Sequence, residues 1–156
     1  MSVQPVPEGF HSVTPHIVCR NASEAIDFYK KAFGAEERYR MPSPRGNLMH
    51  AEIKIGDSIL MLCDEFPNMG TLSPESLEGS PVTLHLYVAD VDAAFKRATE
   101  AGCTVTMPLQ DMFWGDRYGK LSDPYGHQWS LATHKEDLTA EQIGERAAQA
   151  FGGGPC

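Results

Sequence analysis

His16 and His85 stand in matching contexts, Thr-Pro-His and Thr-Leu-His, and either imidazole could donate a hydrogen bond, move a proton or bind a divalent metal ion. Strand residues two apart share a face, so each histidine is expected on the same face as Thr14 or Thr83, two residues earlier. A carboxylate from Glu52 on a neighbouring strand would complete a site of two histidines and one carboxylate. The bland alternative is that both histidines hydrogen-bond an organic ligand or fill a cavity.

Motifs of other catalytic classes are absent from the sequence. No Gly-x-Gly-x-x-Gly run precedes a helix, and neither a GxSxG elbow nor a P-loop occurs. Cysteines are scattered without a CxxC pair, which argues against a zinc knuckle and a dense disulfide framework and favours reduced thiols in a cytoplasm. Cys63 and Cys103 are expected to be buried as small hydrophobic residues, and Cys156, in the glycine-rich tail, is expected to be exposed.

The charge and composition exclude several kinds of partner. A formal net charge of -8 opposes binding to phosphate backbones and anionic membranes, so we expect no nucleic-acid or membrane partner. Hydrophobic residues make up 42% of the chain, which is typical of a globular protein. The N-terminus lacks a basic start followed by an apolar run, and no run is long enough to span a membrane. A soluble cytoplasmic protein is expected.

The sequence repeats itself, and the repeat defines the elements that must position the two histidines. The strand-like segments at residues 13–18 and 82–87 resemble each other, and an amphipathic helix pattern follows each of them. The expected helix N-caps are Asn21, with Glu24 three residues on, and Asp90, and the expected C-terminal stops are Gly34 and Gly102. The pattern predicts a strand, a helix and three strands, twice.

An α+β fold of two βαβββ modules with mixed sheets follows, with a C-terminal helix begun by a Thr139–Gln142 capping box. The strands that follow the helices are expected at residues 36–41, 48–55 and 58–63, and at 104–108, 117–121 and 128–133. We expect a first module at residues 10–65, a linker rich in Pro and Gly at 66–81, a second module at 82–135 and a helix at 138–151, together one domain.

Three segments give the chain a family resemblance. They are residues 25–29 with Phe33-Gly34, residues 111–119 (Asp-Met-Phe-Trp-Gly-Asp-Arg-Tyr-Gly), and residues 123–129 (Asp-Pro-Tyr-Gly-His-Gln-Trp). The chain resembles the vicinal-oxygen-chelate superfamily of glyoxalase, bleomycin-resistance and dioxygenase proteins, and within it the PhnB-like branch. The resemblance implies a cup-like cavity lined by both sheets. It leaves the activity open, because one scaffold serves isomerases, lyases, dioxygenases and non-catalytic drug binders.

Metal-dependent members of that superfamily place four ligands on the cavity face, and the resemblance puts these positions at Thr14, Met61, Thr83 and Ser130. Hydroxyls and a thioether offer neither anionic charge nor imidazole, so a glyoxalase I-type metal centre is not expected. The alternative is a displaced site for zinc, nickel or iron at His16 and His85, with Glu52 or His50 as the third ligand.

We therefore expect a protein that binds a small, partly aromatic or amphipathic molecule, with no cofactor. If it is an enzyme, the resemblance implies a lyase or isomerase of glyoxalase type. The cavity face would carry His16, Met61, His85, Tyr87 and Ser130, with Trp114 and Arg117 at the rim. The other histidines, His11, His127 and His134, are expected at the surface. A half-cup sheet cannot close its own concave face, so a homodimer is expected.

Overall fold

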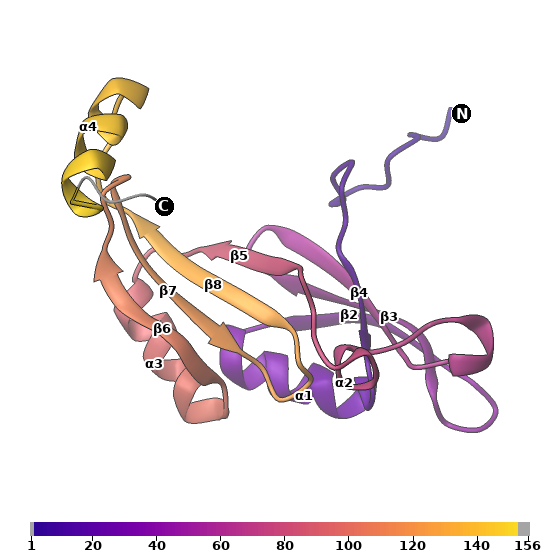
Figure 1. The fold of residues 1–156 in the computed structure, drawn as a ribbon. Helices are drawn as coiled ribbons and strands as arrows, with labels where there is room; N and C mark the ends of the chain where they lie inside the picture. Colours follow the sequence, from indigo (N-terminus) through magenta and orange to yellow (C-terminus); the bar gives the residue numbers. More distant parts are fainter. Residues whose placement is uncertain (1, 153–156) are drawn as a thin grey trace.

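The computed structural model describes residues 2–152, and these form two four-stranded sheets with helices, an α+β fold (Figure 1). In the first module the sheet order is β1-β4-β3-β2, with β1 parallel to β4 and the other pairs antiparallel. Its elements are β1 (His16–Cys19), α1 (Ala22–Phe33), β2 (Glu36–Pro42), β3 (Leu48–Ile55) and β4 (Ser58–Asp64).

The second module repeats this topology with the order β5-β8-β7-β6. Its elements are β5 (Thr83–Tyr87), α3 (Val91–Ala101), β6 (Thr104–Asp111), β7 (Asp116–Ser122) and β8 (Gln128–His134). The repeat extends to the register, since His16 pairs with Met61 and His85 with Ser130. The predicted arrangement of two βαβββ modules is therefore confirmed.

Two strand boundaries differ from the prediction in ways that matter for the site. β1 begins at His16, so Thr14 precedes the strand, where its hydroxyl donates to the carbonyl of His11 at 3.2 Å. β6 continues through Pro108 to Asp111, although proline lacks the amide needed in a ladder. β6 is an edge strand, and its pairing with β7 is irregular between Met107 and Gln110, which accommodates the proline.

The helix caps are those that the sequence predicts. The side chains of Asn21 and Asp90 accept hydrogen bonds from backbone amides of the first turn of α1 and α3. Helix α4 (Ala140–Ala150) begins with a complete capping box between Thr139 and Gln142. The segment between the modules, predicted as a linker at residues 66–81, contains two short helices, η1 (Pro67–Met69) and α2 (Pro74–Leu77).

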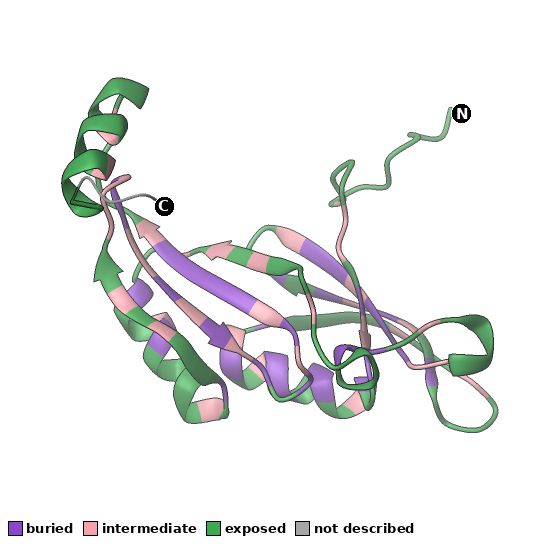
Figure 2. Cartoon of the chain, viewed as in Figure 1, coloured by how far each residue is buried: buried purple, intermediate pink, exposed green. Residues whose placement is uncertain are grey.

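Helices α1 and α3 lie side by side on the same side of the two sheets (Figure 1). Arg97 on α3 joins them by donating from its guanidinium to the carbonyls of Lys30 and Lys31 at the end of α1. The apolar core lies between the helices and the sheets and spans both modules. Figure 2 shows buried residues along β8 and on the helices, whereas β5 alternates between exposed and half-buried residues. The sheet faces that point away from the helices are thus left open.

The β7–β8 turn ties the second module to the first. Asp123 in this turn is buried, and its Oδ1 accepts from the amides of Tyr125 and His127 at 2.9 and 3.0 Å. Its Oδ2 accepts from the Tyr29 hydroxyl of α1 at 2.6 Å and from the Trp129 indole at 2.8 Å. The expected turn is present, and its carboxylate also anchors the two modules together.

His127 corrects one prediction. Instead of lying at the surface it is buried, and its Nε2 donates to the carbonyl of Val18 at the end of β1, at 2.8 Å. The histidine therefore caps the edge of the other module's sheet. His11 is exposed, as expected, and Cys156 lies outside the described residues. Within residues 2–152 no helix is long and apolar enough to cross a membrane.

Candidate ligand-binding site

The open face of the second sheet is organised around His85. Register places His85 beside Ser130, and Ser130 beside Lys120, in one row across β5, β8 and β7. The next row holds Tyr87 on β5 and Tyr118 on β7, with Ala132 between them. Because side chains two apart along a strand share a face, these polar and aromatic groups point to the same side.

Ser130 favours one proton arrangement of His85. The two side chains meet at 2.6 Å between Ser130 Oγ and His85 Nδ1, and Ser130 is buried. Among the described residues, His85 Nδ1 is the hydrogen-bond partner of the Ser130 side chain. The buried Ser130 hydroxyl therefore has an acceptor for its proton only if it donates to Nδ1. The Nε2 atom of neutral His85 then carries the proton. Burial lowers the pKa of His85 and outweighs the Asp116 carboxylate, which acts to raise it. The lowered pKa favours the neutral form of His85.

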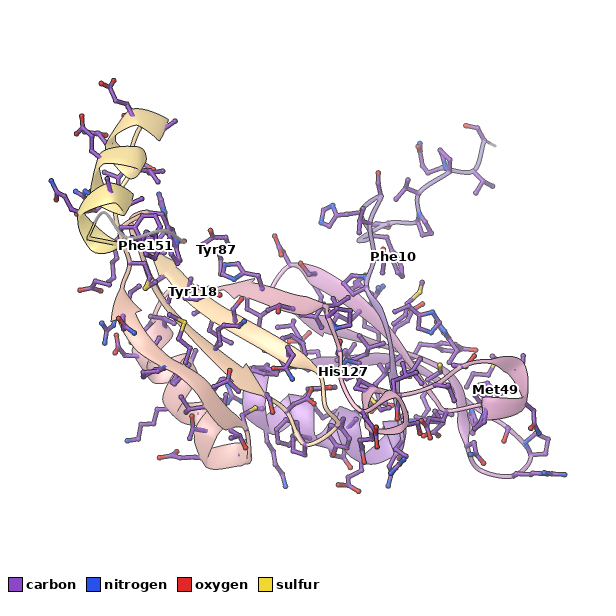
Figure 3. The ribbon with its side chains drawn as sticks, in the orientation of Figure 1. Phe10, Met49, Tyr87, Tyr118, His127 and Phe151 are labelled. Atoms are coloured by element: carbon purple, nitrogen blue, oxygen red, sulfur yellow. The ribbon has the colours of Figure 1, made fainter. Side chains whose placement is uncertain are left out.

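Aromatic rings surround His85 and continue to the end of the sheet. Its ring centroid lies 4.6 Å from that of Tyr87, in an edge-to-face arrangement, and 5.8 Å from that of Tyr118. Trp114, on the loop before β7, lies 5.2 Å from Tyr118, also edge to face. Figure 3 labels Tyr87 and Tyr118 close together on this face, near helix α4. We call Tyr87, His85, Tyr118 and Trp114 the aromatic cluster.

Asp116 lies beneath the aromatic cluster and holds two of its members. The carboxylate is 4% exposed, and its Oδ2 accepts from the Tyr87 hydroxyl at 3.1 Å and from the Trp114 indole at 3.0 Å. Its Oδ1 lies 2.7 Å from Nδ1 of His134. Burial opposes ionisation of Asp116, but hydrogen bonds from His134, Trp114 and Tyr87 outweigh burial and lower its pKa.

Gly115 is the residue that allows the Trp114 loop to take this shape. Its φ of +100° is in the region that side-chain-bearing residues rarely adopt. A Cβ there would lie 2.6 Å from the carbonyl oxygen of Glu136, which is too close. The Gly115 carbonyl also accepts from the amides of Lys135 and Glu136. The tight approach of the two segments thus sets the position of Trp114.

The open face of the first sheet carries a different set of groups. His16, Met61 and Glu52 lie in one row across β1, β4 and β3. His50 is near both ends of this row, with its ring 5.8 Å from that of His16 and its Nε2 3.4 Å from Glu52 Oε1. Arg38 pairs with Glu52 at 3.8 Å. Burial, followed by the neighbouring His50, lowers the pKa of His16.

The donor atoms do not fit a glyoxalase I-type metal ion. Of the four positions that the resemblance implies, Ser130 is hydrogen-bonded to His85 and Thr14 to the His11 carbonyl, and Met61 offers only a thioether. Within residues 2–152 no group of three or more His, Cys, Asp and Glu side chains is placed to hold a metal ion. His16 and Glu52 lie on one sheet and His85 on the other.

The structure separates Arg117 from the other expected site residues. Arg117 alternates with Asp116 and Tyr118 along β7 and therefore points to the helix side of the sheet. There its guanidinium pairs with Asp92 at the start of α3 at 2.9 Å and with Asp111 at 3.3 Å. The prediction that Arg117 lies at the cavity rim is therefore wrong. Asp116 and Tyr118, which were not predicted as site residues, lie on the open face instead.

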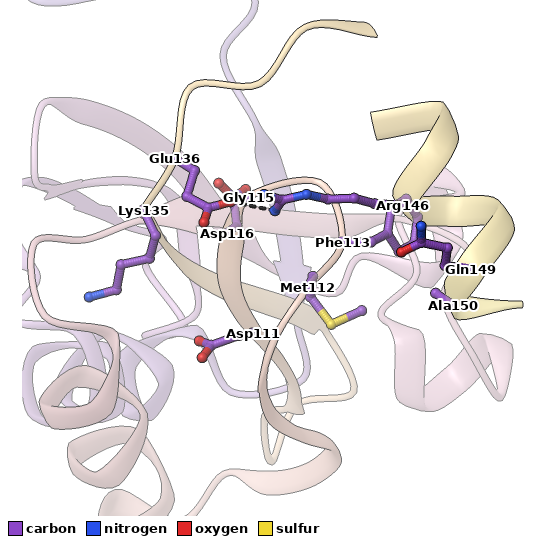
Figure 4. Close-up of a pocket in the computed structure, with 10 residues that line it drawn as sticks. All are labelled: Asp111, Met112, Phe113, Gly115, Asp116, Lys135, Glu136, Arg146, Gln149 and Ala150. Atoms are coloured by element: carbon purple, nitrogen blue, oxygen red, sulfur yellow. Dashed lines mark hydrogen bonds and ion pairs between the residues drawn. The ribbon is translucent and has the colours of Figure 1, made fainter. Parts of the chain in front are cut away.

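Two hollows border the aromatic cluster. One, of about 800 Å³, runs along β5 between the modules, and His85, Tyr87, Phe33 and Arg97 are among its lining residues. The other, of about 820 Å³, lies between the loop that precedes β7 and helix α4. Figure 4 shows Asp116 on the wall of this second hollow, with Lys135, Glu136 and Arg146 around its opening. Asp116 thus separates the aromatic cluster from a hollow of mixed charge.

Comparison with known proteins places these features in a family. A family model described as Glyoxalase/Bleomycin resistance protein/Dioxygenase superfamily matches residues 9–131. The protein Rv0887c of Mycobacterium tuberculosis is 47% identical over 135 residues, which are 85% of this chain and 79% of the relative.

Two solved structures share the fold. TioX from Micromonospora sp. ML1 superposes with a TM-score of 0.62 at 25% identity, covering 83% of this chain and 100% of TioX. A PhnB protein from Bacillus cereus gives a TM-score of 0.60 at 21% identity, covering 79% of this chain and 99% of that protein. The second likeness supports the predicted PhnB-like fold.

Proposed function

Because the chain belongs to the Glyoxalase/Bleomycin resistance protein/Dioxygenase superfamily, we propose that it binds a small, partly aromatic or amphipathic molecule on the open faces of its two sheets. The observation that carries this proposal is the aromatic cluster. Four rings, linked by three ring–ring contacts, lie on a sheet face that no helix or strand within residues 2–152 covers, and Tyr87 in this cluster is 65% exposed. Exposed aromatic groups of this kind are typical of ligand sites.

The cluster offers both affinity and orientation. The ring faces provide apolar area, and His85 provides one fixed hydrogen-bond donor, the Nε2–H set by Ser130. A ligand with an aromatic body and an oxygen acceptor would satisfy both. Met61 and His16 on the first sheet would supply an adaptable second wall.

We propose that this second wall comes from another copy of the chain. Helices α1 and α3 pack together, which leaves both open faces on the side away from the helices. A two-fold dimer in which the first sheet of one copy faces the second sheet of its partner would close two equal cavities. Buried free thiols at Cys19, Cys63 and Cys103 support a place in the reducing cytoplasm.

The alternative function is that of a metal-dependent lyase, isomerase or dioxygenase. It is favoured by one observation, the closeness of His50 to His16 and to Glu52 on the first sheet, although within one chain these three are not placed to hold a metal ion. In the proposed dimer, His85 of the other copy would face this group, and zinc, nickel or iron would polarise an oxygen of the substrate there. The donor atoms described above fit this alternative less well than they fit an organic ligand.

Native mass spectrometry of the protein purified from its own organism, with elemental analysis, separates these functions. We expect a dimer that retains an organic molecule and holds substoichiometric metal. One tightly held zinc, nickel or iron per chain, lost when His16 and His85 are replaced by alanine, would overturn the binding function in favour of the metal site. A monomer at micromolar concentration would contradict the shared cavity.

A further inference from the structure

We propose that the bound molecule is a cation, with an ammonium group that lies against the rings of Tyr87, Tyr118 and Trp114 above Asp116. This inference rests on the proposed binding function and specifies the chemical class of its ligand. It follows from three features of the cluster: how its rings are polarised, what net charge lies beneath them, and which cations are near.

The hydrogen bonds to Asp116 make the rings better cation acceptors. The Tyr87 hydroxyl and the Trp114 indole N–H both donate to the same carboxylate oxygen, Oδ2. An anionic acceptor on a phenol or an indole N–H pushes electron density into the ring, which strengthens the negative potential over its face. Cations bind to that face, most strongly for tryptophan and tyrosine.

The charge beneath the cluster is negative. His134 bridges Asp116 and Asp137, with 2.7 Å from Nδ1 to one carboxylate and 2.7 Å from Nε2 to the other. Hydrogen bonds to Asp137 and then Asp116 raise the pKa of His134, which favours the imidazolium form. Two carboxylates beside one imidazole leave at least one negative charge, even when His134 is protonated. His85, at the centre of the cluster, is neutral and does not oppose a cation.

The nearby cationic side chains differ in whether they compete for the site. Arg117 is paired with Asp92 and Asp111 on the helix side of the sheet and is not available. Lys120 lies on the open face, in the row of His85 and Ser130, one row away from the row of Tyr87 and Tyr118. An ammonium ligand would therefore bind on the Asp116 side of His85 and leave its oxygen acceptors toward His85 and Lys120.

Two probes of equal shape test the inference on the full chain. The probes are 4-hydroxyphenyltrimethylammonium and 4-tert-butylphenol. Their trimethylammonium and tert-butyl groups differ in charge but hardly in size. Isothermal titration calorimetry is expected to show about tenfold tighter binding of the cation, about 1.4 kcal/mol. As an anionic probe, 4-hydroxybenzenesulfonate carries its charge at the same position, and it is expected to bind more weakly than both.

Asp116→Asn tests the origin of the preference. The amide oxygen can still accept from Tyr87 and Trp114, so the cation's advantage should fall to about threefold or less while 4-tert-butylphenol binds as before. Asp111→Asn is the matched control, since it removes a carboxylate that pairs with Arg117 on the helix side, at the end of the neighbouring strand β6, and it should leave the ratio unchanged. If Asp116→Asn does not fold, Tyr87→Phe removes one of the two polarising hydrogen bonds at an exposed position and should reduce the ratio in the same direction.

The outcomes separate the two proposals. Equal affinity for the cation and the neutral probe, or tighter binding of the anion, would overturn the inference and leave the binding function in place. A tenfold preference that Asp116→Asn does not reduce would also overturn it. Failure of all three probes to bind at millimolar concentration would count against the binding function itself.

Discussion

The two modules share a backbone but differ in what they present on their open faces. In the first, His16, His50, Glu52 and Met61 form a polar, sulfur-containing surface. In the second, the aromatic cluster covers the equivalent surface, and a buried carboxylate lies beneath it. The backbone repeat is maintained by the helix-side core, which both modules need, whereas the open face is free to differ. Function is therefore to be sought in the difference between the modules and not in their similarity.

The hydrogen bonds that hold the start of each helix also differ between the two modules. In the first module Asp64 accepts from the amides of Ala22 and Leu48, at 2.7 and 2.6 Å. At the matching place in the second module, the Thr133 hydroxyl accepts from the amide of Val91 at 2.9 Å. One task is performed by a carboxylate in one module and by a hydroxyl in the other, because only the hydrogen bond to the helix start is required.

The largest effect is expected from removing the anchor that only the second module has. Asp123→Ala leaves the buried Tyr29 hydroxyl and Trp129 indole without an acceptor, which should cost about 3–5 kcal/mol of the free energy of unfolding. Asp64→Ala, in the first module, leaves two amides unpaired and should cost less, about 2–3 kcal/mol. Urea unfolding measures both. A smaller loss for Asp123→Ala than for Asp64→Ala would contradict the role of the β7–β8 turn as the link between modules.

Truncating the aromatic cluster should affect binding more than stability. Trp114→Ala is expected to weaken the binding of 4-tert-butylphenol roughly tenfold while lowering the free energy of unfolding by under about 1 kcal/mol. Leu77→Ala removes an exposed apolar side chain from the short helix α2 and should change affinity by less than about threefold. Calorimetry and thermal unfolding of both variants give the comparison. Loss of the dimer with unchanged affinity per folded chain would assign Trp114 to the subunit interface instead.

The smallest effect is a pH dependence that belongs to the second module. Hydrogen bonds to Asp137 and Asp116 raise the pKa of His134 above its ordinary value of 6.5, so the folded state binds this proton more tightly than the unfolded state. The resulting stabilisation is complete below pH 6.5 and is lost as the pH rises through the folded-state pKa. The stability difference between the protein and His134→Gln should therefore be larger at pH 6 than at pH 9, by urea unfolding. A difference that is larger at pH 9 would show that His134 is neutral in the fold.

Sequence alone predicted the backbone better than the site. The repeated strand, the helix caps and the Asp-Pro-Tyr-Gly turn are local patterns, and each is found as predicted. Asp116 was missed because its three donors come from β5, β8 and the loop before β7, which no local pattern brings together. The misplacement of Arg117 was an error of one residue along a strand, and such a step reverses the face to which a side chain points. His127 was missed because its partner, the Val18 carbonyl, belongs to the other module.

The central claim, that the ligand binds to the aromatic cluster of the second sheet, is tested most directly by the two tryptophan indole N–H signals in a nuclear magnetic resonance titration. Both indoles donate to a carboxylate, Trp114 to Asp116 on the open face and Trp129 to Asp123 in the core, so each is a control for the other. With the signals assigned from Trp114→Phe, addition of 4-hydroxyphenyltrimethylammonium should shift the Trp114 signal progressively and leave the Trp129 signal in place. A Trp114 signal that stays fixed while calorimetry shows saturable binding would place the ligand elsewhere and contradict the account.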